Sequence, residues 1–203
     1  NARSIRRSDL NIFKGKNFEI SVWPAALSLL PVACAFGVFL TITPDFVSDL
    51  GYQYKGVFNT IIVVASISMR FVAGKASDRY GREPILAIGG FLLFLGMGIL
   101  SYSTTQLWAA IGGVVYGLSI GINMPTIFAW TADLAPKGKI ALAIGTTLVS
   151  LEIGIGMGAS ISGSLFSSDY AWLPLLYRFC ALSGLIMALV LLFAKRKPMT
   201  SVN

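Results

Sequence analysis

Residues 84–132 read PILAIGGFLLFLGMGILSYSTTQLWAAIGGVVYGLSIGINMPTIFAWTA, a run of 49 residues without a charged side chain. The middle of this run, from Ser101 to Gln106, is polar, and the apolar stretches on either side approach or exceed the roughly 20 residues that a membrane-spanning helix needs. The run lacks the alternation of apolar and polar residues that a spanning strand would show. It therefore predicts two transmembrane helices with a short polar connection.

The rest of the chain has the same character. Its 203 residues are 55% hydrophobic and only 12% charged, with a mean hydropathy of +0.74, whereas a soluble domain is about 25% charged. We predict an all-α integral membrane protein, flanked by tails at residues 1–19 and 195–203. Its six transmembrane helices are expected over residues 20–45, 55–75, 84–102, 107–132, 140–164 and 171–194.

The positively charged residues indicate the orientation of the helices. Thirteen of the 16 lysines and arginines lie in the two tails and in the second and fourth connections, and the three opposite connections hold only Lys55. Cytoplasmic loops carry such an excess, so both termini are expected in the cytoplasm, with the helices in a bacterial plasma (inner) membrane. The net charge of +7 is thus explained by the lipid bilayer as partner, and no nucleic acid is expected.

Several chemical functions are excluded by composition. There is no histidine, which rules out a zinc site or a catalytic triad built on that residue. The two cysteines, Cys34 and Cys180, both lie in apolar runs, so no disulfide framework or Cys-x-x-Cys metal site can form. We therefore expect no metal, no cofactor and no enzymatic activity.

A charged motif separates the second and third expected helices. Residues 74–83 read GKASDRYGRE. We expect Gly74 to end a helix, and Asp78 to form charge-assisted bonds with the cations that follow it, which would latch neighbouring helix ends. The alternative is an ordinary positive-inside loop in which Asp78 is solvated.

This motif resembles the signature loop of the major facilitator superfamily, G-x-x-x-D-R-x-G-R-[RK]. Glu83 departs from the final basic position of that pattern. The other defined positions are matched by Gly74, Asp78, Arg79, Gly81 and Arg82. The resemblance implies that these residues form a conformational-switch loop, and that the six helices are one half of a major facilitator fold, built as an inverted 3+3 helix repeat.

The resemblance also indicates which half this is. N-terminal halves of the family often carry an arginine in the fourth helix and a G-P-x-x-G-G-like string in the fifth. Here residues 112–117 (GGVVYG) contain no arginine, and residues 154–163 (GIGMGASISG) contain no proline. The resemblance thus implies the C-terminal half of an efflux-type permease for sugars or drugs, with the N-terminal half of the same polypeptide as its partner.

The function that this resemblance implies is secondary active transport of a small solute by alternating access, with protons as candidate coupling ions. The other hypothesis is a six-helix membrane scaffold or assembly subunit that transports nothing.

Polar side chains inside the spans supply candidate pathway residues. The fourth helix carries a stripe at spacings of three and four, made of Tyr116, Ser119, Asn123, Thr126 and Trp130. In the family the first and fourth helices line the pathway, so the stripe is expected to do so, with interhelical hydrogen bonding as the alternative. Cys34 and Thr41 lie on a similar face of the first helix.

Three charged residues inside the spans complete the candidates. Glu152 lies near the middle of the fifth helix, where a charge is costly, and is either a coupling carboxyl or a packing group that hydrogen-bonds between helices. Arg70 and Asp133 lie at comparable depths near the cytoplasmic ends of their helices and are expected to pair, with Arg82 as another partner for Asp133.

Overall fold

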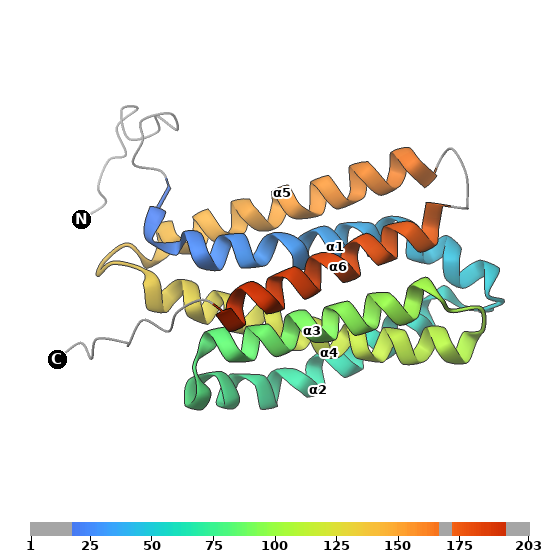
Figure 1. Ribbon diagram of the computed structural model, residues 1–203, viewed down its shortest axis with the longest axis horizontal. Helices are drawn as coiled ribbons and strands as arrows, with labels where there is room; N and C mark the ends of the chain where they lie inside the picture. The colour runs from blue at the N-terminus through green and yellow to red at the C-terminus, as the bar shows by residue number, and fades with distance from the viewer. Residues whose placement is uncertain (1–17, 167–171, 194–203) are drawn as a thin grey trace, which may run out of the picture.

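A computed structural model describes residues 18–166 and 172–193, which fold into six long helices without a β-strand in these ranges (Figure 1). The helices are α1 (Trp23–Asp49), α2 (Lys55–Tyr80), α3 (Arg82–Ser101), α4 (Gln106–Leu134), α5 (Ile140–Phe166) and α6 (Leu173–Phe193), and a 3₁₀ turn, η2 (Ile20–Val22), precedes α1. All six are long and apolar enough to cross a membrane. The predicted all-α membrane fold is confirmed.

The helices pack in a pattern that relates the two halves of the chain. α1 packs mainly on α5, α2 packs mainly on α4, and α3 packs on both α4 and α6. If α1 is exchanged with α4 and α2 with α5, the α1–α5 interface becomes the α4–α2 interface. In Figure 1 the equivalent helices α1 and α4 run in opposite directions, as an inverted repeat of three spans requires.

Glycines allow the backbones to approach closely at these two equivalent interfaces. A Cβ added to Gly117 of α4 would lie 2.4 Å from the carbonyl oxygen of Ile62 on α2. A Cβ added to Gly158 of α5 would lie 2.1 Å from the carbonyl oxygen of Cys34 on α1. Small residues at such spots are typical of helix contacts in membranes, where van der Waals packing drives association.

Burial divides the helices into two groups. In the most apolar segment of each helix, 44–56% of the residues of α1, α3, α4 and α6 are buried within the chain, against only 22% for α2 and 17% for α5. The two outlying helices therefore present broad exposed faces. Their attachment rests on the glycine-lined contacts with α4 and α1.

The junction between α2 and α3 differs from the expected loop. Gly74 does not end a helix, because α2 continues for six more residues to Tyr80, beyond the expected span of residues 55–75. The break comes instead at Gly81, whose φ of 95° and ψ of 161° belong to a region open essentially only to glycine. α3 begins at the next residue, Arg82, so one residue reverses the chain.

One end of the bundle collects most of the described charged groups. α1 starts there, α6 ends there, and the α2–α3 junction and the α4–α5 connection lie there too (Figure 1, left). The expected tails fall mostly at residues 1–17 and 194–203, which lie outside the described ranges. The cations that the structure places near this end are Lys75, Arg79, Arg82, Lys137 and Lys139.

Candidate functional site

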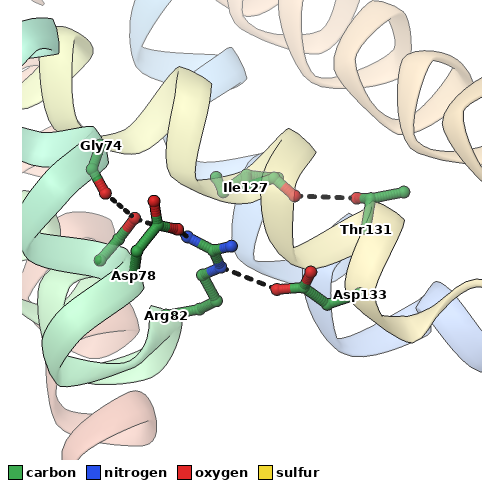
Figure 2. Close-up of polar contacts among 7 residues, drawn as sticks. Gly74, Asp78, Arg82, Ile127, Thr131 and Asp133 are labelled. Carbon is green, nitrogen blue, oxygen red and sulfur yellow. Dashed lines mark hydrogen bonds and ion pairs between the residues drawn. The ribbon is translucent and has the colours of Figure 1, made fainter. Parts of the chain in front are cut away.

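Arg82 joins three helices at this end of the bundle (Figure 2). It is the first residue of α3, immediately after the turn at Gly81. Its Nε donates a hydrogen bond to Asp133 Oδ2 on α4 at 2.8 Å, and its Nη1 donates to Asp78 Oδ1 and to Ser77 Oγ on α2. The bond that we predicted between Asp78 and a cation following it is therefore present.

The surroundings of the Arg82 guanidinium strengthen these bonds. The Arg82 side chain is only 18% exposed, whereas Asp133 is 43% and Asp78 is 69% exposed. The guanidinium thus lies between two carboxylates that keep contact with water, and charge-assisted bonds of this kind are roughly twice as strong as neutral ones. We name the group of Ser77, Asp78, Arg82 and Asp133 the Arg82 cluster; it ties together the ends of α2, α3 and α4.

The expected pair of Arg70 and Asp133 is not formed. Asp133 bonds to Arg82 instead, which was the other partner we considered. Because α2 runs ten residues beyond Arg70, to Tyr80, Arg70 lies roughly 15 Å from the end of its helix at 1.5 Å per residue. Arg79 also stays outside the Arg82 cluster, exposed, with its guanidinium carbon 5.4 Å from the ring centre of Tyr80.

The polar stripe of α4 faces the interior of the bundle. Ser119 Oγ donates a hydrogen bond to the Gly89 carbonyl oxygen of α3 at 2.8 Å, and Asn123 Nδ2 donates to Ser119 Oγ at 3.1 Å. Both polar side chains are fully buried. The Ser119 bond is the kind of interhelical hydrogen bond that we considered as the alternative to lining a pathway, and the Asn123 bond stays within α4.

The other members of the stripe are buried as well. Tyr116 packs against Phe39 of α1, with ring centres 5.1 Å apart, and Thr126 and Trp130 are at most 9% exposed. In the described ranges, the hydroxyl oxygens of Tyr116 and Thr126 have no hydrogen-bond partner. Among the six described helices the stripe is thus packed against α1 and α3 rather than exposed on an open surface, and its place in a pathway stays a prediction.

Cys34 and Thr41 lie at the contact between α1 and α5. The carbonyl of Cys34 lies against Gly158, and Thr41 Oγ1 donates to the Gly37 carbonyl oxygen at 3.0 Å. Both side chains are half-buried. Within the described ranges, no three carboxylate or cysteine side chains gather as metal ligands would.

Glu152 has an exposed side chain in the middle of α5. It shares this face with Gly145 and Gly156, where an added Cβ would meet no atom within 4 Å. The glycines that pack against α1 are Gly154 and Gly158, so the small residues near Glu152 are not a contact surface within this chain. No hydrogen bond joins Glu152 to another described helix, and its candidate packing role is not realised among these six.

Sequence reasoning missed a second charged contact at the same end of the bundle. Glu19 precedes η2, its carboxylate accepts a hydrogen bond from Lys139 Nζ at 3.1 Å, and its N–H donates to Thr146 Oγ1 of α5 at 3.0 Å. The hydrogen bond from Lys139 lowers the pKa of Glu19 below its ordinary value. The signal was a carboxylate that follows five cations and directly precedes the first span.

Comparison with known proteins identifies the fold family. The family model described as Major Facilitator Superfamily matches residues 25–203. The multidrug resistance protein MdtM of Escherichia coli K12 is 29% identical over 166 residues, which cover 75% of this chain and 40% of that protein. A triacylglyceride transporter of Mycolicibacterium smegmatis is 24% identical, over 77% of this chain and 28% of its own length.

A third relative matches more of the chain. The staphylopine export protein of Staphylococcus aureus is 21% identical over 179 residues, 86% of this chain and 44% of that protein. The chain thus spans less than half the length of each of these three curated relatives. Since the family model covers all six helices and the Gly74–Arg82 motif lies between the second and third of them, this chain belongs to the Major Facilitator Superfamily.

Proposed function

We propose that this chain forms the C-terminal half of a secondary transporter that exports a small solute across a bacterial plasma membrane by alternating access. Both termini then lie in the cytoplasm, as the cationic residues predict. The observation that supports this proposal most directly is the position of Glu152, exposed halfway along a membrane-spanning helix.

A carboxylate in that position cannot face lipid without a large cost. Glu152 lies 12 residues after the first residue of α5, roughly 18 Å along the helix at 1.5 Å per residue. Ionisable residues at such depth cost a few kcal/mol and generally face a water-filled cavity or a polar partner. Since the six described helices provide neither, we assign that polar surface to the space between this half and the N-terminal half.

The relatives suggest the class of solute. Two are named for export or multidrug resistance and a third for transport of a triacylglyceride. We propose an amphipathic or lipophilic organic molecule as substrate, and a proton carried by Glu152 as the coupling ion. A carboxyl group that is protonated in one conformation and ionised in the other would bias the equilibrium by its differential affinity for the proton.

The Arg82 cluster has a different role in this proposal. By holding α2, α3 and α4 together at one end, it makes these helices move as a unit when the two halves rock against each other. Asp78 is the most exposed member of the cluster, and we propose that its second carboxylate oxygen bonds to the N-terminal half in one state only.

The test compares Glu152→Gln with Ser160→Ala, a change on the same exposed face, in the full-length protein reconstituted into vesicles. The probe is ethidium, a lipophilic cation. Glu152→Gln should abolish ethidium transport driven by an imposed proton gradient, but it should preserve ethidium exchange across the membrane when no proton gradient is present. Ser160→Ala should preserve both.

Two results would overturn the proposal. Gradient-driven transport at the wild-type rate in Glu152→Gln would remove this carboxyl from coupling. A panel of lipophilic cations, neutral drugs and lipids of which none is moved by the wild-type protein would favour the non-transporting scaffold.

A further inference from the structure

The last turns of α2 carry a second surface feature, separate from the Arg82 cluster. A hollow of about 440 Å³ lies along the exposed face of this helix. It is lined by Phe71, Val72, Lys75, Ala76, Arg79 and Tyr80. Of these lining residues, Arg79 alone occupies a defined position of the family pattern, and the proposed function assigns this hollow no task.

The hollow is positively charged at the end nearer the α2–α3 junction. Lys75 and Arg79 are four residues apart, so they lie on one face of the helix with their Cβ atoms roughly 5–6 Å apart. Neither side chain forms a salt bridge within the described ranges, because the nearby carboxylate of Asp78 is bound to Arg82. The ring of Tyr80 lies beside the Arg79 guanidinium and restricts it. The hollow therefore offers two cations to an anion from outside the chain.

The other end of the hollow is apolar. Phe71 lies one helical turn before Lys75 on the same face and is 75% exposed, and the neighbouring Val72 is 58% exposed. Going from the end of α2 toward the middle of the membrane span, the surface thus changes from cationic to apolar within one or two turns. A phospholipid has the complementary order, with an anionic phosphate followed by acyl chains.

We propose that this hollow binds an anionic phospholipid such as phosphatidylglycerol. The lipid phosphate lies between Lys75 and Arg79, and an acyl chain lies against Phe71 and Val72. Basic sites at the cytoplasmic ends of membrane helices recognise anionic headgroups in this way. The proposal requires the membrane topology given above, and it does not depend on whether the protein transports a solute.

The experiment measures lipid retention by native mass spectrometry of the full-length protein in micelles. The probes are phosphatidylglycerol and phosphatidylcholine with identical acyl chains, which differ in headgroup charge. Removing one basic residue near an anionic lipid surface costs about fivefold in affinity, so Lys75→Gln and Arg79→Gln should each retain about fivefold less phosphatidylglycerol. Lys75→Arg, which keeps the charge, should retain it like the wild type.

A matched control separates a built site from general attraction. Lys137→Gln also removes one exposed cation, from the α4–α5 connection at the same end of the bundle, and should leave phosphatidylglycerol retention unchanged. Equal losses in all three glutamine variants would overturn the proposal in favour of diffuse charge attraction. Unchanged retention in Lys75→Gln and Arg79→Gln would overturn it too, and would indicate that another part of the full-length protein covers the hollow.

Discussion

α4 and α5 follow each other in the chain and are both apolar and rich in glycine, but the polar residue near the middle of each helix is buried in one and exposed in the other. Each is long enough to span a membrane and has one strongly polar residue near its middle, Asn123 in α4 and Glu152 in α5. Asn123 is fully buried and bonded to Ser119, whereas Glu152 is exposed. The difference follows from position, because α4 packs against α2 and α3 on separate sides while α5 packs mainly on α1.

The ends of the two helices do not share this difference. Asp133, near the end of α4, is bound by Arg82, whose side chain is largely buried. Lys139, which precedes α5, is 56% exposed and reaches the Glu19 carboxylate. The Glu19 carboxylate is only 12% exposed, so each of these ion pairs joins one shielded and one exposed partner, and the two helices differ in the burial of their faces rather than at these ends. Four measurements can break or sharpen the contrast between the buried α4 and the outlying α5.

The largest expected effect is on protein stability, when one of two glycines of α5 is replaced by alanine and the other serves as the control. Gly158→Ala should destabilise the protein by about 3 kcal/mol, because the new methyl group would overlap the Cys34 carbonyl oxygen and overpacking costs 1–3 kcal/mol or more. Gly156→Ala places its methyl group in open space and should be neutral or stabilising by up to about 1 kcal/mol through helix propensity. Thermal unfolding of the two variants in detergent gives both values. Equal destabilisation would show that the exposed face of α5 is as tightly packed in the full-length protein as the face toward α1.

The Arg82 cluster should give the next largest effect. Arg82→Gln removes two charge-assisted bonds and leaves two carboxylates near each other, which should lower the free energy of unfolding by about 2 kcal/mol. Arg70→Gln, on an exposed position of α2 without a described ion pair, is the control and should change it by less than about 0.5 kcal/mol. Denaturant titration at low and high salt checks both. A loss of stability that does not shrink with salt would contradict an electrostatic origin.

A smaller effect distinguishes the inward and outward serines. Ser119→Ala breaks the bond to the Gly89 carbonyl oxygen and removes the acceptor of Asn123 Nδ2, and should cost about 1 kcal/mol, at about 0.6 kcal/mol for each hydrogen bond inside a membrane protein. Ser160→Ala on the exposed face of α5 should cost less. If the order were reversed, the assignment of buried and exposed faces to α4 and α5 would be wrong. The same unfolding assay measures both variants.

The smallest effect is a pH dependence of the contact that fixes the start of α5. The pKa of Glu19 is lowered in the folded protein by the hydrogen bond from Lys139. The carboxylate therefore stabilises the folded state above the ordinary pKa of about 4.5, and this contribution is lost as the pH falls through the lower, folded value. Amide exchange of Glu19, whose N–H bonds to Thr146, should accelerate over that acidic range relative to the buried α4 amides. Glu19→Gln should remove the pH dependence.

The sequence was sufficient for the fold and for the Asp78 contact, because both depend on local features. Charge-free runs long enough to cross a bilayer predict spanning helices. Asp78 and Arg82 are only four residues apart, on either side of the turn at Gly81, so they come together without knowledge of the tertiary structure. The motif of residues 74–83 indicated the family, which the family model confirms, and the orientation indicated by the cationic pattern stays a prediction. The exact helix ends were harder to predict, because a single glycine can set them. α2 ends at residue 80 rather than at the expected residue 75, since the break comes at Gly81.

The directions of the polar side chains could not be predicted in this way. A stripe at helical spacing shows that Ser119, Asn123 and Thr126 share a face, but it does not show which neighbour covers that face. The same holds for the glycines of α5, among which only packing distinguishes Gly158 from Gly156. Tertiary contacts between α1, α3 and α4 decide the outcome, and these contacts join residues far apart in the chain.

Gly81 has a genetic consequence that reaches beyond its geometry. Every single-nucleotide missense change in a glycine codon introduces a residue with a Cβ atom, and the backbone angles at this position exclude such residues. A mutant chain would have to open the turn, which would move Arg82 away from both carboxylates at once. A single substitution of Gly81 is therefore not neutral. The glycine can be replaced without loss only after another change has lengthened the junction between α2 and α3.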